Sequence, residues 1–510
     1  MIDRAVGGTR KSRTSIFVGT AACTAIYQLA VILTGFLVPR LIIGAYGSEV
    51  NGLVSSLTQF IAYFALVEAG ISGAAVVMLY KPLADESWSL INKILTAAKR
   101  FYQRSGYVFV VLVLLLAVLY PAFGRVTFLS NVEIALLVIA LGGKGCIDFF
   151  TLSKYRVLLT ADRKTWVIQL ASALYQILNT VIIALLIEQG CPVVIVYYLS
   201  LVAVFARTVI LVVYTKRHYR KARFNVNDEG MTLDQRWDVL FLQLLGVVQQ
   251  GAPIIIATIV LEDYSLVSVF SIYLLISSGL QQLPNFLATG LQASFGELIA
   301  KNEKRALKKA YAAYELLTYV TVVVVCACGF VLIMPFVSLY MAGVTDQNYF
   351  YPALGFFCVL NVVLYHAKSP QGLLIIAAGH YRETRWRSLA QAIILVVAST
   401  VLGIQFGMVG IFAGMCVSNI YRSIDLLFYV PTQITDERIS SSVRRLASNA
   451  MALVASIVIC AQLPISANTW FEWFVWAVGA LAISGVLVLL VNVIVNKTEF
   501  RMIWSKILRK

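Results

Sequence analysis

Ionisable side chains inside long apolar runs are the residues of this sequence with the clearest chemical potential. Six are found: Arg40, Glu68, Lys144, Asp148, Arg207 and Lys368. An ionised group in apolar surroundings costs several kcal/mol unless it faces protein or water, so each is a candidate for function. Four of the six are cations, and a cationic excess suits the neutralisation of a phosphate-bearing or acidic group. We therefore predict that Arg40, Lys144, Arg207 and Lys368 bind substrate.

Other roles for these side chains stay open at this point. Lys144 and Asp148 are four residues apart, so they also fit an ion pair on one helix face. Glu68 and Asp148 are candidates for ion pairing or for ion coupling, with H+ or Na+ as the coupling ion. Arg207 also fits a side chain that extends to the inner membrane interface. His366 fits either a proton-linked group or a packed histidine.

Several chemistries are disfavoured by what the sequence lacks. It has no Walker loop, no dinucleotide-binding glycine pattern and no zinc-ligand spacing, so we predict no catalytic residue, no cofactor and no metal site. The eight cysteines are scattered, mostly inside apolar runs, and predict no disulfide framework. The net charge of +16 comes from short basic clusters between apolar runs, which does not fit nucleic-acid binding.

The elements that position the charged residues are predicted to be membrane helices. Hydrophobic residues make up 60% of the 510 residues and charged residues only 13%, whereas soluble domains contain about 25% charged residues. Spanning helices need roughly 20 apolar residues. About fourteen such segments occur: 15–38, 52–79, 105–124, 132–155, 165–187, 192–214, 239–261, 265–296, 312–340, 351–378, 386–404, 408–430, 446–464 and 473–495. The sequence predicts an all-α integral membrane protein.

The orientation of these helices follows from the basic residues. With the N-terminus inside, clusters such as Lys99–Arg100, Lys216–Arg217 and Lys308–Lys309 fall in inner segments, and Arg125 is the only basic residue of the outer loops. Cytoplasmic loops are enriched in Lys and Arg. We therefore predict a multi-pass protein of the cytoplasmic membrane with both termini in the cytoplasm.

A weak internal repeat divides the predicted helices. The segment LADESWSLINKILTAAKRFY (83–102) aligns with LIAKNEKRALKKAYAAYELL (298–317), and each follows a long helix with polar residues. Two amphipathic inner loops that are merely alike would give the same match. A duplication predicts two pseudo-symmetric six-helix lobes around a central cavity, plus two C-terminal helices. The expected domains are 1–223, 224–436 and 437–510.

One early block resembles a known family. VPRLIIGAYGSEVNGLVSSLTQFIAYFALVEAGISGAAVVMLYKPLA (38–84), followed by LINKILTAAKRFYQRSGY (90–107), resembles the polysaccharide-transporter family of Wzx-type O-antigen and capsule flippases. That family is grouped with multidrug-and-toxin-extrusion exporters and lipid II flippases. The resemblance implies a flippase that moves undecaprenyl-pyrophosphate-linked oligosaccharides from the inner to the outer leaflet by alternating access. Among the candidate site residues, Arg40 and Glu68 lie within the resembling block and are the best supported by the resemblance.

Two other functions remain as alternatives. A cation-coupled multidrug exporter would need acidic residues to dominate its cavity. The six ionisable residues named above instead include four cations and two acids. A membrane-embedded polysaccharide polymerase or glycosyltransferase would need a large outer loop or catalytic acids. The acidic pairs Glu262–Asp263 and Asp436–Glu437 are interpreted instead as solvated caps. The expected partners are the lipid-linked oligosaccharide, membrane lipids and a coupling ion.

Overall fold

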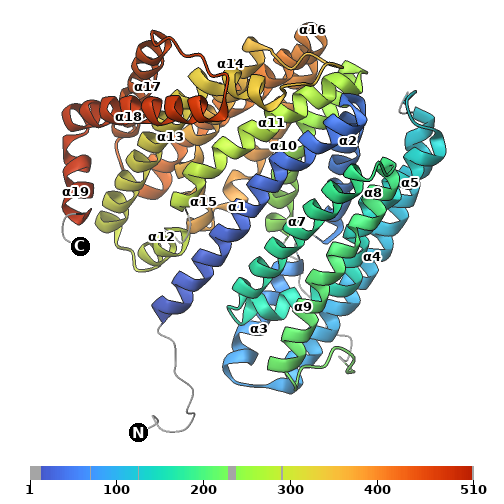
Figure 1. The fold of residues 1–510 in the computed structure, drawn as a ribbon. Helices are drawn as coiled ribbons and strands as arrows, with labels where there is room; N and C mark the ends of the chain where they lie inside the picture. Colours follow the sequence, from blue (N-terminus) through green and yellow to red (C-terminus); the bar gives the residue numbers. More distant parts are fainter. Residues whose placement is uncertain (1–12, 69–70, 124–125, 228–236, 289–290, 508–510) are drawn as a thin grey trace. The chain divides into compact units, whose positions relative to one another are not determined.

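The computed structural model describes residues 13–68, 71–123, 126–227, 237–288 and 291–507. Within these ranges every regular element is a helix and none is a strand (Figure 1). Twelve helices of the described residues are long and apolar enough to cross a membrane. The predicted all-α membrane fold is therefore confirmed, and the chain is a multi-pass membrane protein.

The chain divides into two compact units. Unit 1 contains residues 1–45 and 60–240, and unit 2 contains residues 46–59 and 241–510. The first part of the second helix thus packs within unit 2, although it lies early in the sequence. The domain boundaries at 223 and 436 stay predictions.

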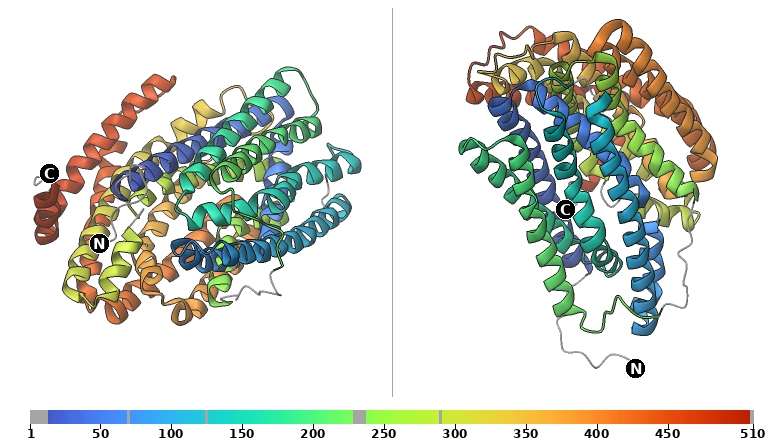
Figure 2. Two further views of the ribbon diagram at one scale, coloured as in Figure 1. Left: turned by 90° about the horizontal axis from the view of Figure 1, so that it is seen from below. Right: turned by 90° about the vertical axis from the view of Figure 1, so that its right-hand side faces the viewer.

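Unit 1 is built from the first half of the chain. Its elements, two of which extend into unit 2, are α1 (Arg13–Tyr46), α2 (Ser48–Phe64), the 3-10 helix η1 (Ala65–Glu68), α3 (Ile71–Ala84), α4 (Trp88–Phe123), α5 (Asn131–Ile147), the π-helix η2 (Asp148–Leu152), α6 (Ser153–Ala161), α7 (Thr165–Glu188), α8 (Val193–Ser200) and α9 (Val202–His218). The helices α4 and α5 pack side by side (Figure 2).

Unit 2 follows the same order and then adds three helices. Its elements are α10 (Trp237–Leu261), which begins in unit 1, α11 (Tyr264–Asn285), η3 (Phe286–Ala288), α12 (Leu291–Ala300), α13 (Lys304–Tyr340), α14 (Pro352–Ala367), α15 (Ser369–Ala378), α16 (Tyr381–Val430), the π-helix η4 (Pro431–Thr435), α17 (Ile439–Ala461), α18 (Trp470–Val495) and α19 (Lys497–Ile507). The helix α13 packs against both α17 and α18.

Two predicted spans are interrupted at corresponding places. The segment 52–79 consists of α2, η1 and α3, and the segment 265–296 consists of α11, η3 and the start of α12. In each case a short 3-10 helix ends the first part, and such turns have poorer hydrogen-bond geometry than an α-helix. The break between α5 and α6 likewise corresponds to the break between α14 and α15. The two halves of the chain therefore repeat one order of elements.

The helix α16 is a hairpin of two antiparallel arms. Gly407 has φ 60° and ψ −140°, a backbone conformation that is essentially restricted to glycine. Across the turn, Ser399 Oγ donates to the carbonyl of Ile411 at 3.2 Å. Ser418 Oγ donates to the carbonyl of Gln391 at 2.9 Å. The two arms match the predicted segments 386–404 and 408–430. The predicted span 351–378 is formed by two shorter helices, α14 and α15. The predicted number of fourteen spans is therefore approximate, because several of the spans are broken.

The start of α2 is fixed within unit 2 by polar contacts. Asp346 accepts hydrogen bonds from the backbone N–H of Ser48 at 2.6 Å and from its hydroxyl at 3.1 Å. Asn51 donates to Ser268 of α11 at 2.8 Å. A β-carbon at Gly52 would lie only 1.8 Å from the carbonyl oxygen of Tyr264. Close approach of α2 and α11 therefore requires glycine at position 52.

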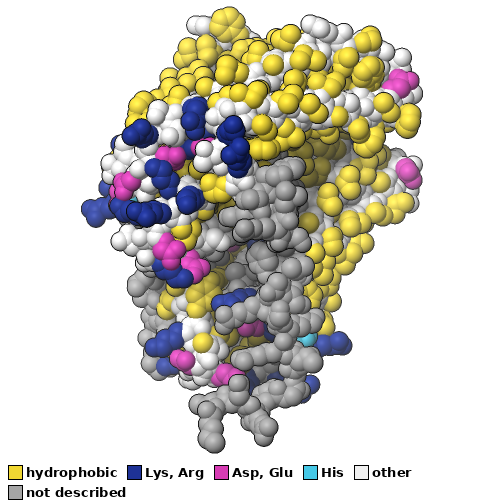
Figure 3. Space-filling view, turned by 90° about the vertical axis from the view of Figure 1, so that its left-hand side faces the viewer, with side chains coloured by type: hydrophobic (Ala, Val, Ile, Leu, Met, Phe, Trp, Pro, Cys, Tyr) yellow, Lys and Arg dark blue, Asp and Glu magenta, His cyan; other side chains and the backbone are white. Residues whose placement is uncertain are grey.

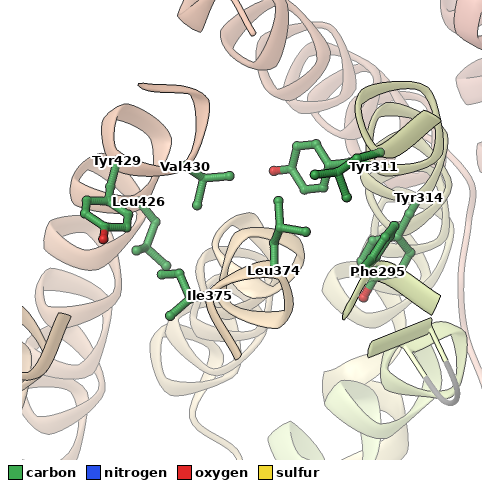
Figure 4. Close-up of a cluster of buried hydrophobic side chains, with 9 residues drawn as sticks. Phe295, Tyr311, Tyr314, Leu374, Ile375, Leu426, Tyr429 and Val430 are labelled. Carbon is green, nitrogen blue, oxygen red and sulfur yellow. The ribbon is translucent and has the colours of Figure 1, made fainter. Parts of the chain in front are cut away.

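An apolar cluster joins α12, α13, α15 and α16 in unit 2. Figure 4 shows its side chains pointing toward one another from these helices. The members are Phe295, Leu307, Tyr311, Tyr314, Leu374, Ile375, Leu426, Tyr429 and Val430, all less than 10% exposed. Burial of this surface stabilises the contacts of the short helices α12 and α15, which are too short to be stable alone.

Large apolar side chains also cover much of the outside. Leu33, Phe471 and Ile494 are 69%, 77% and 77% exposed. On the face drawn in Figure 3, hydrophobic side chains form a broad area in which Lys and Arg side chains are nearly absent. Such an area would destabilise a protein in water and suits contact with lipid.

Candidate functional site

Two of the predicted site residues form an ion pair in unit 1. Arg207 of α9 donates to Asp148, and the two side chains are 11% and 22% exposed. Asp148 is the first residue of the π-helix η2, which carries an extra residue per turn relative to an α-helix. The carboxylate is thus bound by a cation of another helix. The ion pair between Lys144 and Asp148, left open by the sequence, is not formed.

Tyr175 of α7 brings the two cations of unit 1 together. The ammonium of Lys144 and the guanidinium carbon of Arg207 each lie 4.9 Å from the centroid of its ring. The ring is buried, with 6% of the residue exposed. A cation over an aromatic face is attracted by the ring quadrupole, and more strongly where water is excluded. Sequence reasoning missed Tyr175, because nothing distinguishes it from the other aromatic residues of the apolar runs.

Lys144 forms no ion pair with a described carboxylate. Among the described residues no carboxylate lies within 4 Å of its ammonium, since Asp148 is bound to Arg207. The residue as a whole is exposed, while its ammonium lies against the buried ring of Tyr175. A cation on a membrane helix that is not held by a carboxylate is a candidate for binding an anionic ligand.

Glu68 lies where the second span is interrupted. It ends η1 and lines a cavity of about 240 Å³ in unit 1. The polar residues that line the same cavity are Tyr102, Ser153, Arg156 and Thr160. Both roles considered for Glu68 fit this setting, because the cavity offers a guanidinium for pairing and hydroxyl oxygens for an ion. Arg156 is a further lining residue, which the sequence analysis did not select as a candidate.

Lys368 occupies the break between α14 and α15. It caps the end of α14, and Pro370, which lacks a backbone donor, is the second residue of the next helix. Its ammonium lies 5.5 Å from the centroid of the Tyr365 ring. No described carboxylate lies within 4 Å of this ammonium, and the lysine is only half-buried.

His366 is a buried histidine whose two nitrogens both have partners. Nδ1 lies 3.2 Å from the hydroxyl of Ser369, and Nε2 lies 3.2 Å from the carbonyl oxygen of Gln281. The residue has no solvent exposure. These contacts favour the packed histidine over the proton-linked group.

The repeated order of elements makes the two breaks comparable. Asp148 follows α5 in unit 1, and Lys368 follows α14 in unit 2. Arg207 lies on α9, and the second arm of α16 carries Arg422, which pairs with Asp425 at 2.6 Å. Unit 2 therefore has a cation at the position where unit 1 has an acid.

Arg40 lies within α1 directly after Pro39, a proline that the helix accommodates without ending. Its Nη1 lies 3.9 Å from the position that a β-carbon on Gly44 would take. The guanidinium thus extends along its own helix. The predicted role of Arg40 in substrate binding stays a prediction.

Unit 2 contains a buried ionic network that the sequence did not indicate. Arg445 of α17 binds Glu315, Glu437 and Glu499 at 2.6, 3.1 and 3.3 Å. Arg445 and Glu315 have no exposed side-chain surface. The interpretation of Glu437 as a solvated cap is wrong, because its side chain is only 6% exposed. Its neighbour Asp436 is 59% exposed, and the pKa of this carboxyl is lowered by hydrogen bonding to Lys304.

Comparison with known proteins supports the fold. No family model and no curated protein matches the chain. Among solved structures, the lipid II flippase MurJ in its inward closed conformation is similar over 92% of this chain and 98% of its own, with TM-score 0.65 and 14% identity. An inward-facing multidrug resistance MATE family transporter of the MOP superfamily is similar over 82% and 96%, with TM-score 0.63 and 14% identity. The chain therefore has the fold of these transporters.

A further neighbour carries a notable description. A MOP superfamily transporter from Pyrococcus furiosus, described by a reversed polarity of its binding pocket, is similar over 86% of this chain and 99% of its own. The TM-score is 0.54 and the identity 13%. One fold thus accommodates binding pockets of different polarity, and the charges of each chain must be examined individually.

Proposed function

We propose that this protein flips a lipid-linked oligosaccharide, held through a pyrophosphate, from the inner to the outer leaflet of the cytoplasmic membrane by alternating access. The proposed substrate class is undecaprenyl-pyrophosphate-linked repeat units for surface polysaccharide, and both termini lie in the cytoplasm. The observation that carries the proposal is the pair of intramembrane lysines, Lys144 and Lys368, that have no carboxylate within 4 Å among the described residues.

Electrostatics explain why such lysines suit this cargo. Two unit charges 4 Å apart attract by about 4 kcal/mol at an effective dielectric constant of 20, compared with about 1 kcal/mol in water. A pyrophosphate carries several negative charges that must be matched before it can cross the apolar layer. A lysine that is paired with a carboxylate would have to break that ion pair before it could bind a phosphate. Lys144 and Lys368 have no such ion pair to break among the described residues. Arg207, which is bound to Asp148, is proposed to position Lys144 through their shared contact with Tyr175.

The fold supports transport over an enzymatic role. The similar structures named above are a flippase, a MATE transporter and a further MOP superfamily transporter. A second candidate function, cation-coupled drug export, is favoured by one observation, namely Glu68 in the polar cavity of unit 1. Glu68 serves either function as a site for H+ or Na+.

The test is substitution of the unpaired lysines. We expect Lys144→Gln and Lys368→Gln each to lower the transfer of lipid-linked oligosaccharide to the outer leaflet about 10-fold or more, since loss of about 1.4 kcal/mol is a factor of ten. Transfer is measured in reconstituted vesicles, and surface polysaccharide is measured in cells at equal expression. Lys301→Gln, which removes an exposed lysine bound to Glu297, is the control.

The outcome of a parallel assay separates the two functions. If both lysine variants transfer lipid-linked oligosaccharide normally, the flippase proposal is wrong. If the wild-type protein instead exports cationic dyes and Glu68→Gln abolishes that export, drug transport is the function.

A further inference from the structure

The residues that follow α9 form an extended segment of unit 1, here called the strap and defined as residues 219–227. The backbone N–H of Ala222 donates to the carbonyl of Tyr219 at 3.0 Å and turns the chain away from the helix. Beyond this turn, half-buried and exposed residues alternate, which is the period of an extended chain with one face against protein. The half-buried residues are Ala222, Phe224 and Val226, and the exposed ones are Arg223 and Asn225.

Asn92 of α4 binds the backbone of the strap twice. Its Nδ2 donates to the carbonyl of Lys221 at 3.1 Å, and its Oδ1 accepts from the N–H of Arg223 at 2.8 Å. A neighbouring β-strand would supply the same two kinds of bond. Only 8% of Asn92 is exposed, so this contact is largely shielded from water.

Two further side chains of α4 continue this contact along the strap. Oγ1 of Thr96 accepts from the backbone N–H of Val226 at 3.2 Å. The ammonium of Lys99 donates to Oδ1 of Asn225 at 2.5 Å. Spacings of three and four residues place side chains on one face of a helix. The strap is therefore fastened along a single face of α4.

The strap also contacts α6 and the turn that follows this helix. The ring of Phe224 packs edge-on against Tyr155, with the ring centroids 5.1 Å apart. The hydroxyl of Tyr219 donates to Asp162, the residue after α6, and Asp162 also pairs with Lys164 at 2.9 Å. Since α4 and α6 pack against each other, the strap bridges two neighbouring helices of unit 1.

The two bridged helices also form walls of the cavity that contains Glu68. Four of the residues that line this cavity belong to α6, among them Ser153 and Arg156, and Tyr102 belongs to α4. Tyr102 lies less than one helical turn beyond Lys99, which binds the strap. Only 4% of Ser153 is exposed. The spacing of α4 and α6 therefore sets the width of the cavity.

We propose that the strap is a clamp that holds α4 and α6 together beside the Glu68 cavity, and that its release widens this cavity. The strap lies at the surface and is held chiefly by hydrogen bonds, and segments with few buried apolar contacts open at low free-energy cost. Widening gives water and the coupling ion considered for Glu68 access to its carboxylate. That access rests on the proposed ion site, whereas the widening itself is independent of the ion and of the cargo.

Labelling of a cysteine in the cavity tests the clamp. Ser153→Cys is introduced into the full-length protein in lipid nanodiscs, and its reaction with a small water-soluble methanethiosulfonate is followed by peptide mass spectrometry. We expect Asn92→Ala to raise the labelling rate about 10-fold, because it removes two backbone contacts of the strap. Thr96→Val keeps the shape of the side chain but removes one contact, so it should raise the rate about 3-fold.

Hydrogen exchange of the same samples reports on the strap itself. The backbone amides of Arg223 and Val226 should lose protection in Asn92→Ala. Asn131→Ala, which truncates an exposed asparagine at the start of α5, is the matched control and should change neither measurement.

Three outcomes overturn the clamp. Unchanged labelling of Ser153→Cys despite loss of amide protection means that the strap opens without moving the cavity wall. Retained protection in Asn92→Ala means that this side chain does not fasten the strap. An equal rise in labelling at Cys358 of unit 2, which has no exposed surface, assigns the reaction to unfolding.

Discussion

The partner of Asp148 decides which cation of unit 1 is available. Arg207 takes this carboxylate and leaves Lys144 over the ring of Tyr175. The sequence identified all three charged residues from their position in apolar runs, but it did not identify their pairing. The backbone N–H of Asp148 donates to the carbonyl of Lys144, so this turn is α-helical and permits contact between the two side chains. Spacing within one helix does not reveal a competing cation on another helix, and here Arg207 of α9 binds the carboxylate.

Removal of one member of this ion pair should destabilise unit 1. We expect Asp148→Asn to lower the free energy of unfolding by on the order of 3 kcal/mol, because Arg207 then keeps a largely buried charge without a counter-ion. Thermal unfolding in detergent measures the change. The double variant Asp148→Asn with Arg207→Gln should recover part of the loss, and purely additive effects would contradict the pairing.

Interrupted helices are the recurring element of this fold. The sequence predicted the spans well as apolar segments, yet it treated 52–79 and 265–296 as continuous helices. Hydropathy records burial in lipid and is insensitive to a short 3-10 turn within an apolar run. Glu68, assigned to the middle of a helix, instead lies at the end of η1 beside a cavity. The position of the Glu68 carboxylate beside the cavity thus follows from the interruption of the helix and not from the face of a continuous helix.

The contact between α2 and α11 gives a prediction at this scale. Gly52→Ala places a β-carbon 1.8 Å from the carbonyl oxygen of Tyr264, so the two backbones must separate. We expect a loss of roughly 3 kcal/mol or more in stability, the upper range for overpacking. Gly246→Ala is the matched control, since a β-carbon there meets nothing within 4 Å. Equal melting temperatures for the two variants would contradict this close approach.

At the scale of the whole molecule, composition and periodicity were sufficient for the all-α membrane class. The repeated order of elements was visible only weakly, because apolar side chains that face lipid interchange freely and leave little similarity between the halves. The buried network around Arg445 could not be foreseen. Its acids are spread along the chain from Glu315 to Glu499, and each member alone resembles a residue of a basic inner segment or a solvated cap.

The proposed orientation is testable with thiol reagents on intact cells. Cys191 lies in a predicted outer loop, and Lys301 lies in a predicted inner segment. We expect a membrane-impermeant maleimide to label Cys191. In the background Cys191→Ser, Lys301→Cys should react only after the membrane is permeabilised. The opposite pattern would place both termini outside.

The hairpin of α16 has a consequence for how the chain enters the bilayer. Its arms are joined at Gly407 without a hydrophilic loop, and Ser399 contacts Ile411 directly across the turn. The chain around the turn is apolar, so no hydrophilic segment separates the two arms. We therefore expect the two arms to enter the lipid together as a helical hairpin, and a truncation after the first arm to leave a segment without its packing partner.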